Sequence, residues 1–238
     1  MVNKCIDFIQ SFIYPGRCLL CGTHIQAPAG LCPGCHGELP LNHCCCPRCA
    51  LPLPAHCSPV TPCGECQRKA PPFDRCIAPF LYQPPLDHLI NGLKFRARLP
   101  NSRLLASLLA EQLRRWAVDR PDALIPVPLH RTRLRHRGYN QALELARHLG
   151  HQLSIPLNQT SCIRQYPTPP QSGSNRNQRH RNLRGAFLLR DQSTARHVAL
   201  VDDVVTTGAT VSELARTLKR GGIKRVDVWA VARTPRMR

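Results

Sequence analysis

Four cysteine pairs with the same internal spacing are the first feature of this 238-residue chain that could do chemistry. Two residues separate the cysteines of each pair, so a tight turn can direct both sulfurs at one ion while backbone amides donate hydrogen bonds to them. Two such pairs complete a tetrahedron of thiolates, which suits Zn²⁺. The pairs form a first set, Cys18, Cys21, Cys32 and Cys35, and a second set, Cys46, Cys49, Cys63 and Cys66. We therefore predict two zinc sites.

Other uses of these cysteines stay open. An iron–sulfur cluster or disulfides would use the same residues, but regular pairing without a redox motif favours zinc. Four thiolates leave no position for a reactive water, so we expect the metal to be structural. Further candidates for an exchanged ligand in the second set are Cys44, Cys45, Cys57, His36, His43 and His56. We expect Gly22, Gly34 and Gly64 to adopt a positive φ in the turns.

A second motif combines acids, threonines and a glycine in residues 198–210, which have the sequence VALVDDVVTTGAT. We interpret it as a buried strand, two acids, a small polar loop and the start of a helix. Ligands of open α/β sheets bind beyond the carboxyl ends of strands, and amides at a helix N-terminus there bind anions. The residues expected to wrap a phosphate are Thr206, Thr207, Gly208, Ala209 and Thr210. Asp202 and Asp203 can accept hydrogen bonds from vicinal sugar hydroxyls, so the motif predicts a site for a ribose 5-phosphate. The alternative is a solvated strand end with a capped helix.

Two basic segments could neutralise further negative charge on such a ligand. Residues 125–141 place a strand end with Pro128 before several arginines, of which Arg133 and Arg137 are our candidates for ligand binding. Residues 164–187 have no core pattern before Leu183, which predicts a long loop of the kind that often forms a lid. The arginines of that loop are Arg176, Arg179, Arg181 and Arg184.

These loops must be positioned by an alternation of strands and helices. The patterns predict strands at 76–82, 123–129, 197–202 and 225–232, and helices at 84–93, 102–118, 140–149 and 210–220. This order is typical of an α/β domain with a mostly parallel sheet. We expect Asn101 or Ser102 to cap the helix 102–118 and Trp116 to lie on its apolar face. Gly221 and Gly222 are expected to end the helix 210–220.

Composition divides the chain near residue 72. We predict an amphipathic helix at 1–16, a double zinc ribbon at 17–72 and the α/β domain at 73–238. The formal net charge is +19, and residues 73–238 carry 28 basic and 11 acidic residues, against 5 and 3 in residues 1–72. This charge and a hydrophobic content of 42% exclude the acidic disordered class.

We find no run of 18 apolar residues and no small-residue cleavage site, so we expect no membrane span, no signal peptide and a reducing cytoplasm.

Residues 198–210 resemble the phosphoribosyl pyrophosphate (PRPP) signature of type I phosphoribosyltransferases. The resemblance implies that Asp202 and Asp203 hold the ribose hydroxyls, that the loop 206–210 holds the 5-phosphate, and that Mg²⁺ bridges the pyrophosphate. Together with the zinc knuckles, the segment 125–141 and the loop 164–187, the chain from about residue 18 to 234 is similar to the ComF/GntX family. That similarity implies a type I phosphoribosyltransferase-like domain behind a double zinc ribbon, and an association with natural competence and with external DNA as a nutrient.

Three classes of function remain after this resemblance. The first is an enzyme that transfers a phosphoribosyl group to an unidentified acceptor, with Asp202, Asp203 and Arg179 as catalytic residues. The second is a PRPP-responsive or purely single-stranded DNA-binding module, and the third is a scaffold that docks a DNA-uptake helicase. Only 5% of the residues are aromatic, so platforms for stacking bases are few. We predict a PRPP-binding protein of DNA uptake or DNA utilisation, and whether it catalyses transfer stays open.

Overall fold

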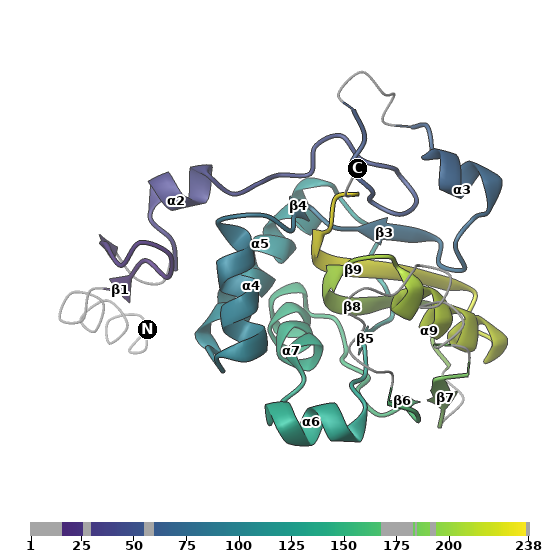
Figure 1. Cartoon of the computed structure of the whole chain (residues 1–238). Coiled ribbons are helices and arrows are strands. Elements are labelled where there is room, and N and C mark those ends of the chain that lie inside the picture. Colours follow the sequence, from purple (N-terminus) through teal and green to yellow (C-terminus); the bar gives the residue numbers. More distant parts are fainter. Residues whose placement is uncertain are drawn as a thin grey trace.

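The structure is a computed structural model that describes residues 16–25, 30–54, 60–167, 183, 185–190 and 194–236. Figure 1 shows an α/β body with two small cysteine-rich parts at its side and top. Residues 1–15 of the predicted N-terminal amphipathic helix lie outside the described residues. Within these ranges, no helix is long and apolar enough to cross a membrane.

A five-stranded sheet forms the centre of the body. Its strands are β3 (Arg75–Ile77), β4 (Phe80–Leu81), β5 (Ala123–Pro126), β8 (His197–Val205) and β9 (Arg225–Arg233). The order is β3-β9-β8-β5, β4 also pairs with β9, and all these pairings are parallel. β8 and β9 are buried over most of their length, as expected for central parallel strands rich in Val, Ala and Leu. The predicted α/β class with a mostly parallel sheet is confirmed.

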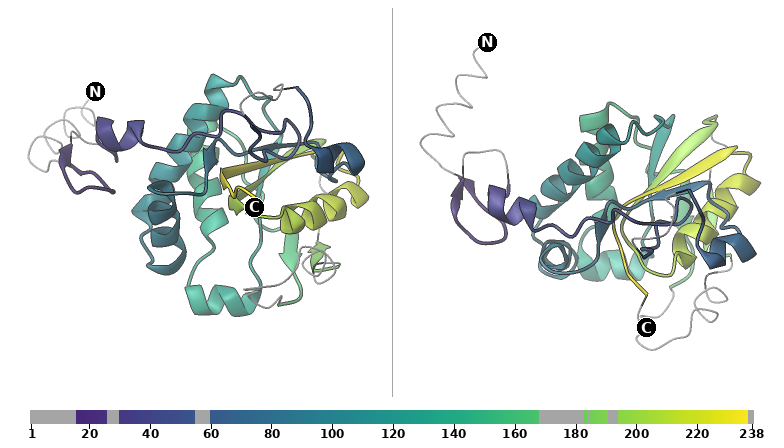
Figure 2. Two further views of the ribbon diagram at one scale, coloured as in Figure 1. Left: turned by 45° about the horizontal axis from the view of Figure 1, so that its top comes forward. Right: turned by 90° about the horizontal axis from the view of Figure 1, so that it is seen from above.

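Helices cover both faces of this sheet (Figure 2, right). On one face lie α4 (Leu86–Phe95), α5 (Pro100–Arg115) and α7 (Gln141–Leu153). The leucines of these helices and the side chain of Trp229 form one hydrophobic core. On the other face, α9 (Ala209–Arg220) packs on β8 and β9 around a second core. Packing in the two cores fixes the direction of β8, and therefore the position of Asp202 and Asp203 near its carboxyl end.

Several local predictions were wrong. The predicted strand 76–82 is two strands, β3 and β4. The helix predicted at 102 begins at Pro100 without a side-chain cap, because its N-cap is Leu99, which has no side-chain acceptor. Asn101 and Ser102 lie inside the helix and donate to the carbonyls of Leu89 and Leu99, at 2.8 and 2.7 Å. Trp116 is 39% exposed, and Trp229 takes the place of a large aromatic in the core. Within the α/β domain, three of the described elements were not predicted: the helix α6 (Arg131–Arg137) and the antiparallel pair β6 (Cys162–Arg164) and β7 (Phe187–Leu189).

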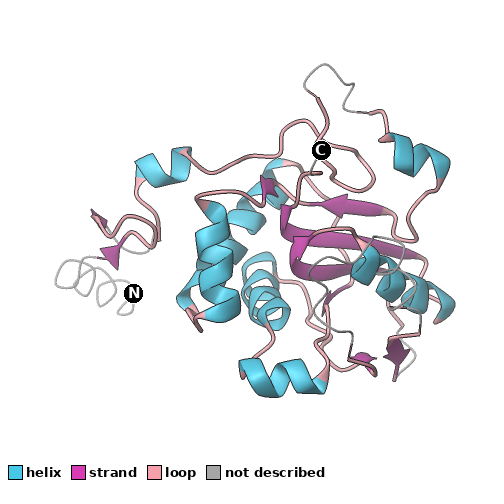
Figure 3. Ribbon diagram, in the orientation of Figure 1, coloured by secondary structure: helices cyan, strands magenta, loops and turns pink. Residues whose placement is uncertain are grey.

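The cysteine-rich parts consist largely of loops (Figure 3). The first carries β1 (Gly16–Arg17), β2 (His24–Ile25) and the short helix α2 (Pro33–Gly37). The second carries the short helix α3 (Gly64–Arg68). Backbone hydrogen bonds join the connecting segment to the body, from Leu81 to Pro40 at 2.7 Å and from Asn42 to Pro79 at 2.8 Å. The zinc-ribbon region is thus attached along the outer strands of the sheet.

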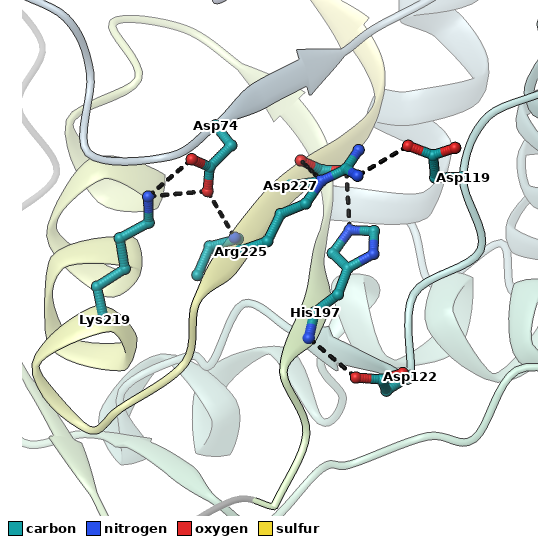
Figure 4. Close-up of polar contacts among 8 residues, drawn as sticks. Asp74, Asp119, Asp122, His197, Lys219, Arg225 and Asp227 are labelled. Carbon is teal, nitrogen blue, oxygen red and sulfur yellow. Dashed lines mark hydrogen bonds and ion pairs between the residues drawn. The ribbon is translucent and has the colours of Figure 1, made fainter.

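A network of charged side chains fixes the amino ends of β8 and β9 (Figure 4). Asp227 is fully buried and accepts hydrogen bonds from Arg225 and His197, both at 2.9 Å. Arg225 also pairs with Asp119 at 2.7 Å, and Asp122 accepts from the amide of His197 at 2.9 Å. This network belongs to the end of the sheet opposite Asp202 and Asp203, so we assign it to stability.

Candidate functional site

The loop between β8 and α9 has the geometry of an anion-binding turn. β8 ends at Val205 and α9 begins at Ala209, which leaves three residues, 206–208, in between. Gly208 is the N-cap with φ +77°, a left-handed conformation that suits glycine. The Ala209 side chain is buried in the core, whereas Thr206 is exposed and Thr207 is half-buried. The first amides of a helix have no intrahelical acceptor, so those of α9 can donate to a phosphate.

Two acids lie near the carboxyl end of β8, before its last two residues, and one of them has an oxygen without a partner among the described residues. Asp203 is 2% exposed. Its Oδ1 accepts from the amide of Val204 at 2.7 Å and lies 3.2 Å from the Lys94 ammonium. Its Oδ2 is buried and has no hydrogen-bond partner among the described residues. A buried carboxylate oxygen without a partner is costly, so this atom is suited to accept a hydroxyl of a ligand.

Asp202 is half-buried, and its pKa is raised. Its Oδ1 accepts from the amide of Asp203 at 2.9 Å. Burial of the carboxyl and then the neighbouring Asp203 carboxylate raise the pKa of Asp202 to about 8, against the opposing effect of Lys94. The pair therefore holds a proton near neutral pH, which limits the negative charge beside a phosphate site.

Pro128, Arg133 and Arg137 lie on the neighbouring strand end and the helix after it. β5 pairs with β8 in the register Pro126 to Val201, so Pro128 follows a strand end that lies beside the acids. α6 is capped by His130, which accepts from the amide of Thr132, and it ends at Gly138 with φ +81°. Arg133 and Arg137 are one helical turn apart, on the same side of α6.

The two arginines of α6 have different surroundings. The Arg137 guanidinium donates to Gln141 at 2.6 Å and lies 5.6 Å from the Phe95 ring. Burial and then Arg137 lower the pKa of Arg133. The structure therefore places both predicted arginines on the helix that follows β5, the strand paired with β8, and Arg137 is already held by protein contacts.

Two cations at this site were not predicted. Lys94 comes from the last turn of α4 and pairs with Asp203, a long-range contact that sequence spacing does not indicate. Arg164, at the end of β6, is 9% exposed and stacks 5.7 Å from the Phe187 ring. Burial and then Arg133 lower the pKa of Arg164 to about 10, and the Asp202 carboxylate opposes this shift. The signal that could have found Arg164 is its place directly after the apolar residues Cys162 and Ile163.

The predicted lid lies largely outside the described residues. This holds for its four arginines, Arg176, Arg179, Arg181 and Arg184. The described end of the segment is anchored to α9, because the amide of Gly185 donates to Glu213 at 3.0 Å. The catalytic role expected for Arg179 stays a prediction.

The eight predicted metal ligands come together in two groups. In each group, all four sulfurs lie within 4.8 Å of one another. The distances between Cys21 and Cys32 and between Cys49 and Cys63 are both 3.7 Å from sulfur to sulfur. A tetrahedral site with Zn–S bonds of about 2.3 Å has edges of about 3.8 Å. The described cysteines form no disulfide, so the groups fit structural zinc.

The two groups repeat one backbone pattern. After the first pair of each group, an amide closes the turn onto the first cysteine: Gly22 onto Cys18 and Ala50 onto Cys46, both at 2.9 Å. Gly22 and Ala50 have φ of +76° and +54°.

The second pair of each group begins a short helix, with Cys32 or Cys63 as its N-cap. The expectation of a positive φ was correct for Gly22 and wrong for Gly34 and Gly64, since these two lie inside α2 and α3.

The other candidates for a ligand of the second group that the structure describes do not belong to it. Cys46 belongs to it, whereas Cys44 and Cys45 lie outside both groups. Burial raises the pKa of the Cys45 thiol, which disfavours its thiolate. Cys57 and His56 lie outside the described residues. The amide of Cys63 donates to the Cys46 sulfur at 3.2 Å, which is the kind of contact that stabilises a bound thiolate.

Comparison with known proteins agrees with the cysteine-rich region. The family model for a double zinc ribbon domain matches residues 9–68. Solved structures that align with the chain include the purine phosphoribosyltransferase of Pyrococcus horikoshii, at 22% identity and a TM-score of 0.33, covering 54% of this chain and 70% of that one. Another is TT1426 of Thermus thermophilus, at 17% identity and a TM-score of 0.34, covering 57% and 84%.

Two relatives align over almost their whole length. DNA utilization protein YhgH of Salmonella typhimurium is 37% identical over 225 residues, covering 92% of this chain and 98% of that protein. Competence protein F of Haemophilus influenzae is 35% identical over 230 residues, covering 91% and 96%. The resemblance noted in the sequence is confirmed, and the chain belongs to the family of DNA utilization protein YhgH and competence protein F.

Proposed function

We propose that this chain binds PRPP at the carboxyl end of β8 and acts in the uptake of DNA or in its use as a nutrient. The observation that carries the proposal is the buried Asp203 Oδ2, which has no hydrogen-bond partner in the described part of the chain, on the strand that leads directly into the N-terminus of α9. An anion site and a hydroxyl acceptor side by side match a sugar phosphate. The role in DNA uptake or utilisation rests on the printed names of the two relatives.

The ligand would extend across the ends of β8 and β5. We place its 5-phosphate on the loop 206–210 and its ribose hydroxyls on Asp202 and Asp203. Its pyrophosphate would face Pro128, Arg133 and Arg164, where two partly desolvated guanidinium groups can neutralise it. Mg²⁺ bound with PRPP would supply further charge neutralisation. The same arrangement would stabilise pyrophosphate as a leaving group, so we include phosphoribosyl transfer to an unidentified acceptor in the proposal.

Calorimetric titration of the zinc-loaded protein with PRPP and Mg²⁺ tests the site. We expect binding by the unchanged chain and its loss in the double variant Asp202→Asn/Asp203→Asn. Asp119→Asn is the matched control, because Asp119 is an exposed acid near the opposite end of the sheet. The proposal fails if the unchanged chain binds no PRPP, or if the double variant binds it equally well.

A second function, binding of single-stranded DNA, is favoured by exposed aromatics near the basic helix α6. Phe95 is 72% exposed and stacks with Arg137, and Tyr166 is 59% exposed. Aromatic faces next to arginines are typical platforms for bases, and phosphate contacts make such binding sensitive to salt. We expect Phe95→Ala to weaken binding of an oligothymidylate about tenfold, within the range of one lost stacking contact.

Fluorescence anisotropy at two salt concentrations measures this binding, with Trp116→Ala as a control at another exposed aromatic. Equal losses in both variants would argue against a DNA site at Phe95. The cytoplasmic location and docking on a DNA-uptake helicase stay predictions. We base the location on the reduced thiols that zinc sites require.

A further inference from the structure

Arg233, the last residue of β9, joins the second cysteine group to the candidate phosphate loop. Its side chain is buried, at 5% exposure for the residue. The guanidinium Nη1 donates to the carbonyl of Val205 at 2.8 Å and to that of Thr206, and Nε donates to the carbonyl of Cys49 at 3.1 Å. One cation thus contacts both a metal-binding residue and the first residues of the loop.

The direction of these contacts matters for the ligand. In a trans peptide the carbonyl of one residue and the amide of the next point in opposite directions. Because Arg233 holds the carbonyls of Val205 and Thr206, it directs the amides of Thr206 and Thr207 to the opposite side. A positive charge on the carbonyl side also polarises these peptide groups, which makes their amides better donors. Both effects favour an anion on the amide side.

The second cysteine group is fixed to the same part of the sheet by further contacts. The amide of Cys76 donates to the carbonyl of Arg48 at 2.8 Å. The Asn42 side chain donates to the carbonyls of Ala50 and Ala78, at 2.9 and 3.0 Å. Beyond β9, Thr234 donates through its amide to Val205 at 3.0 Å. A bound metal that orders the turn 46–50 therefore also orders the acceptor that holds Arg233.

The first cysteine group has different neighbours. Cys18 and Leu31 belong to the core built around α4 and α5, and a Cβ on Gly30 would lie 3.0 Å from Leu104. In the described ranges, no hydrogen bond connects this group with residues 205–210. It serves as an internal control for the second group.

We propose that Arg233 is a positioning residue that couples zinc at Cys46, Cys49, Cys63 and Cys66 to ligand binding at the loop 206–210. The proposal rests on the proposed PRPP site. Coupling between two binding sites is reciprocal. If zinc in the second group raises the affinity for PRPP, then PRPP raises the affinity of that group for zinc by the same factor, and the first group shows no such effect.

The first experiment uses the unchanged, zinc-loaded chain. It is incubated with a chelator and a thiol-alkylating reagent, with and without PRPP and Mg²⁺, and mass spectrometry follows the alkylation of each cysteine. We expect PRPP to slow alkylation of Cys46 and Cys49 severalfold and to leave Cys18 and Cys21 unchanged. Equal protection of both groups, or protection of neither, would overturn the coupling.

The second experiment compares Arg233→Lys with Arg225→Lys, the same substitution at the two ends of β9. A lysine keeps the charge at 233 but has a single donor nitrogen in place of Nε, which contacts Cys49, and Nη1, which contacts Val205 and Thr206. We expect Arg233→Lys to weaken PRPP binding about tenfold and to abolish the selective protection, with both zinc ions retained. Arg225→Lys should lower the melting temperature and keep both properties.

The outcomes separate this coupling from the proposed function. PRPP binding by the unchanged chain together with unaltered affinity and protection in Arg233→Lys would remove the coupling and leave the PRPP site standing. Absence of PRPP binding by the unchanged chain would overturn both. If Arg233→Lys fails to fold, the alkylation of the unchanged chain decides the question.

Discussion

At the scale of single residues, the candidate site consists of common carboxylates and cations that differ from surface residues in their burial and in their partners. Sequence spacing was enough to single out the two acids as candidates, because they directly follow the apolar residues 198–201, although β8 continues past them to Val205. Spacing could not identify Lys94, which reaches Asp203 from another helix. It also could not reveal that Asp203 keeps one buried oxygen without a partner in the described part of the chain. Such properties arise from packing between distant segments.

The raised pKa of Asp202 leads to a prediction about stability. In the folded chain this carboxyl has a pKa of about 8, whereas an unfolded aspartate has about 3.9. Between these values the folded state binds the extra proton, so the contribution of Asp202 to stability falls as the pH rises from about 4 to 8. The asparagine in the Asp202→Asn variant does not titrate, so it lacks this loss of stability with rising pH. We therefore expect the melting temperature of the variant to rise relative to the unchanged chain as the pH rises through this range.

Thermal unfolding of the zinc-loaded proteins between pH 5 and 9 measures this difference. Effects of pH on the zinc thiolates are common to both proteins and cancel in the comparison. Asp119→Asn serves as a control, since its pKa is lowered by Arg225 and its effect should be constant over the same range. A difference between Asp202→Asn and the unchanged chain that does not vary with pH would contradict a raised pKa at Asp202.

At the scale of elements, the sequence predicted those that have an apolar period and missed those that do not. α4, α5, α7 and α9 were all expected, although with shifted ends. α6 has seven residues, four of them arginine, and no buried residue, so its limits are set by the His130 cap and the left-handed Gly138. β6 and β7 have three residues each and pair across a long sequence separation. Short elements of this kind are defined by caps and partners, which a pattern of hydrophobicity does not contain.

The turn between β8 and α9 gives a prediction at this scale. A Cβ on Gly208 would have free space, with Val205 as its nearest neighbour at 3.9 Å, so only the backbone conformation opposes a side chain there. A left-handed alanine costs about 1 kcal/mol or more. We expect Gly208→Ala to destabilise the chain by about 1 kcal/mol and to weaken PRPP binding, because relaxation of φ moves the amides of the loop.

The control for this turn is Gly138→Ala, which places the same strain at the end of α6. Chemical denaturation and calorimetry together compare the two variants. Similar losses of stability but a loss of PRPP affinity in Gly208→Ala alone are the expected result. Equal affinity in both variants would show that the loop 206–210 does not hold the phosphate.

At the scale of the whole molecule, the charge network and the proposed ligand site lie at opposite ends of the sheet. The amino ends of β8 and β9 carry a charge network in which every acid is paired (Figure 4). The carboxyl ends carry the incompletely satisfied acids and the loop 206–208. An α/β sheet of parallel strands permits this division, because all strands end at one edge and ligands bind there.

This separation predicts opposite effects of two aspartate substitutions. Asp227→Asn leaves Arg225 and His197 facing a buried amide, and loss of one partner of a buried ion pair costs about 3 kcal/mol or more. For a chain of this length that corresponds to a fall in melting temperature of roughly 6–12 °C. PRPP affinity at a temperature where the variant is folded should stay unchanged. Asp203→Asn should mainly lower PRPP affinity, because it changes the carboxylate that pairs with Lys94 at the place where the ligand hydroxyl is expected. Calorimetric melting and PRPP titration of both variants test this pair of predictions. A parallel loss of stability and of PRPP affinity in either variant would mean that the two ends of the sheet are not independent.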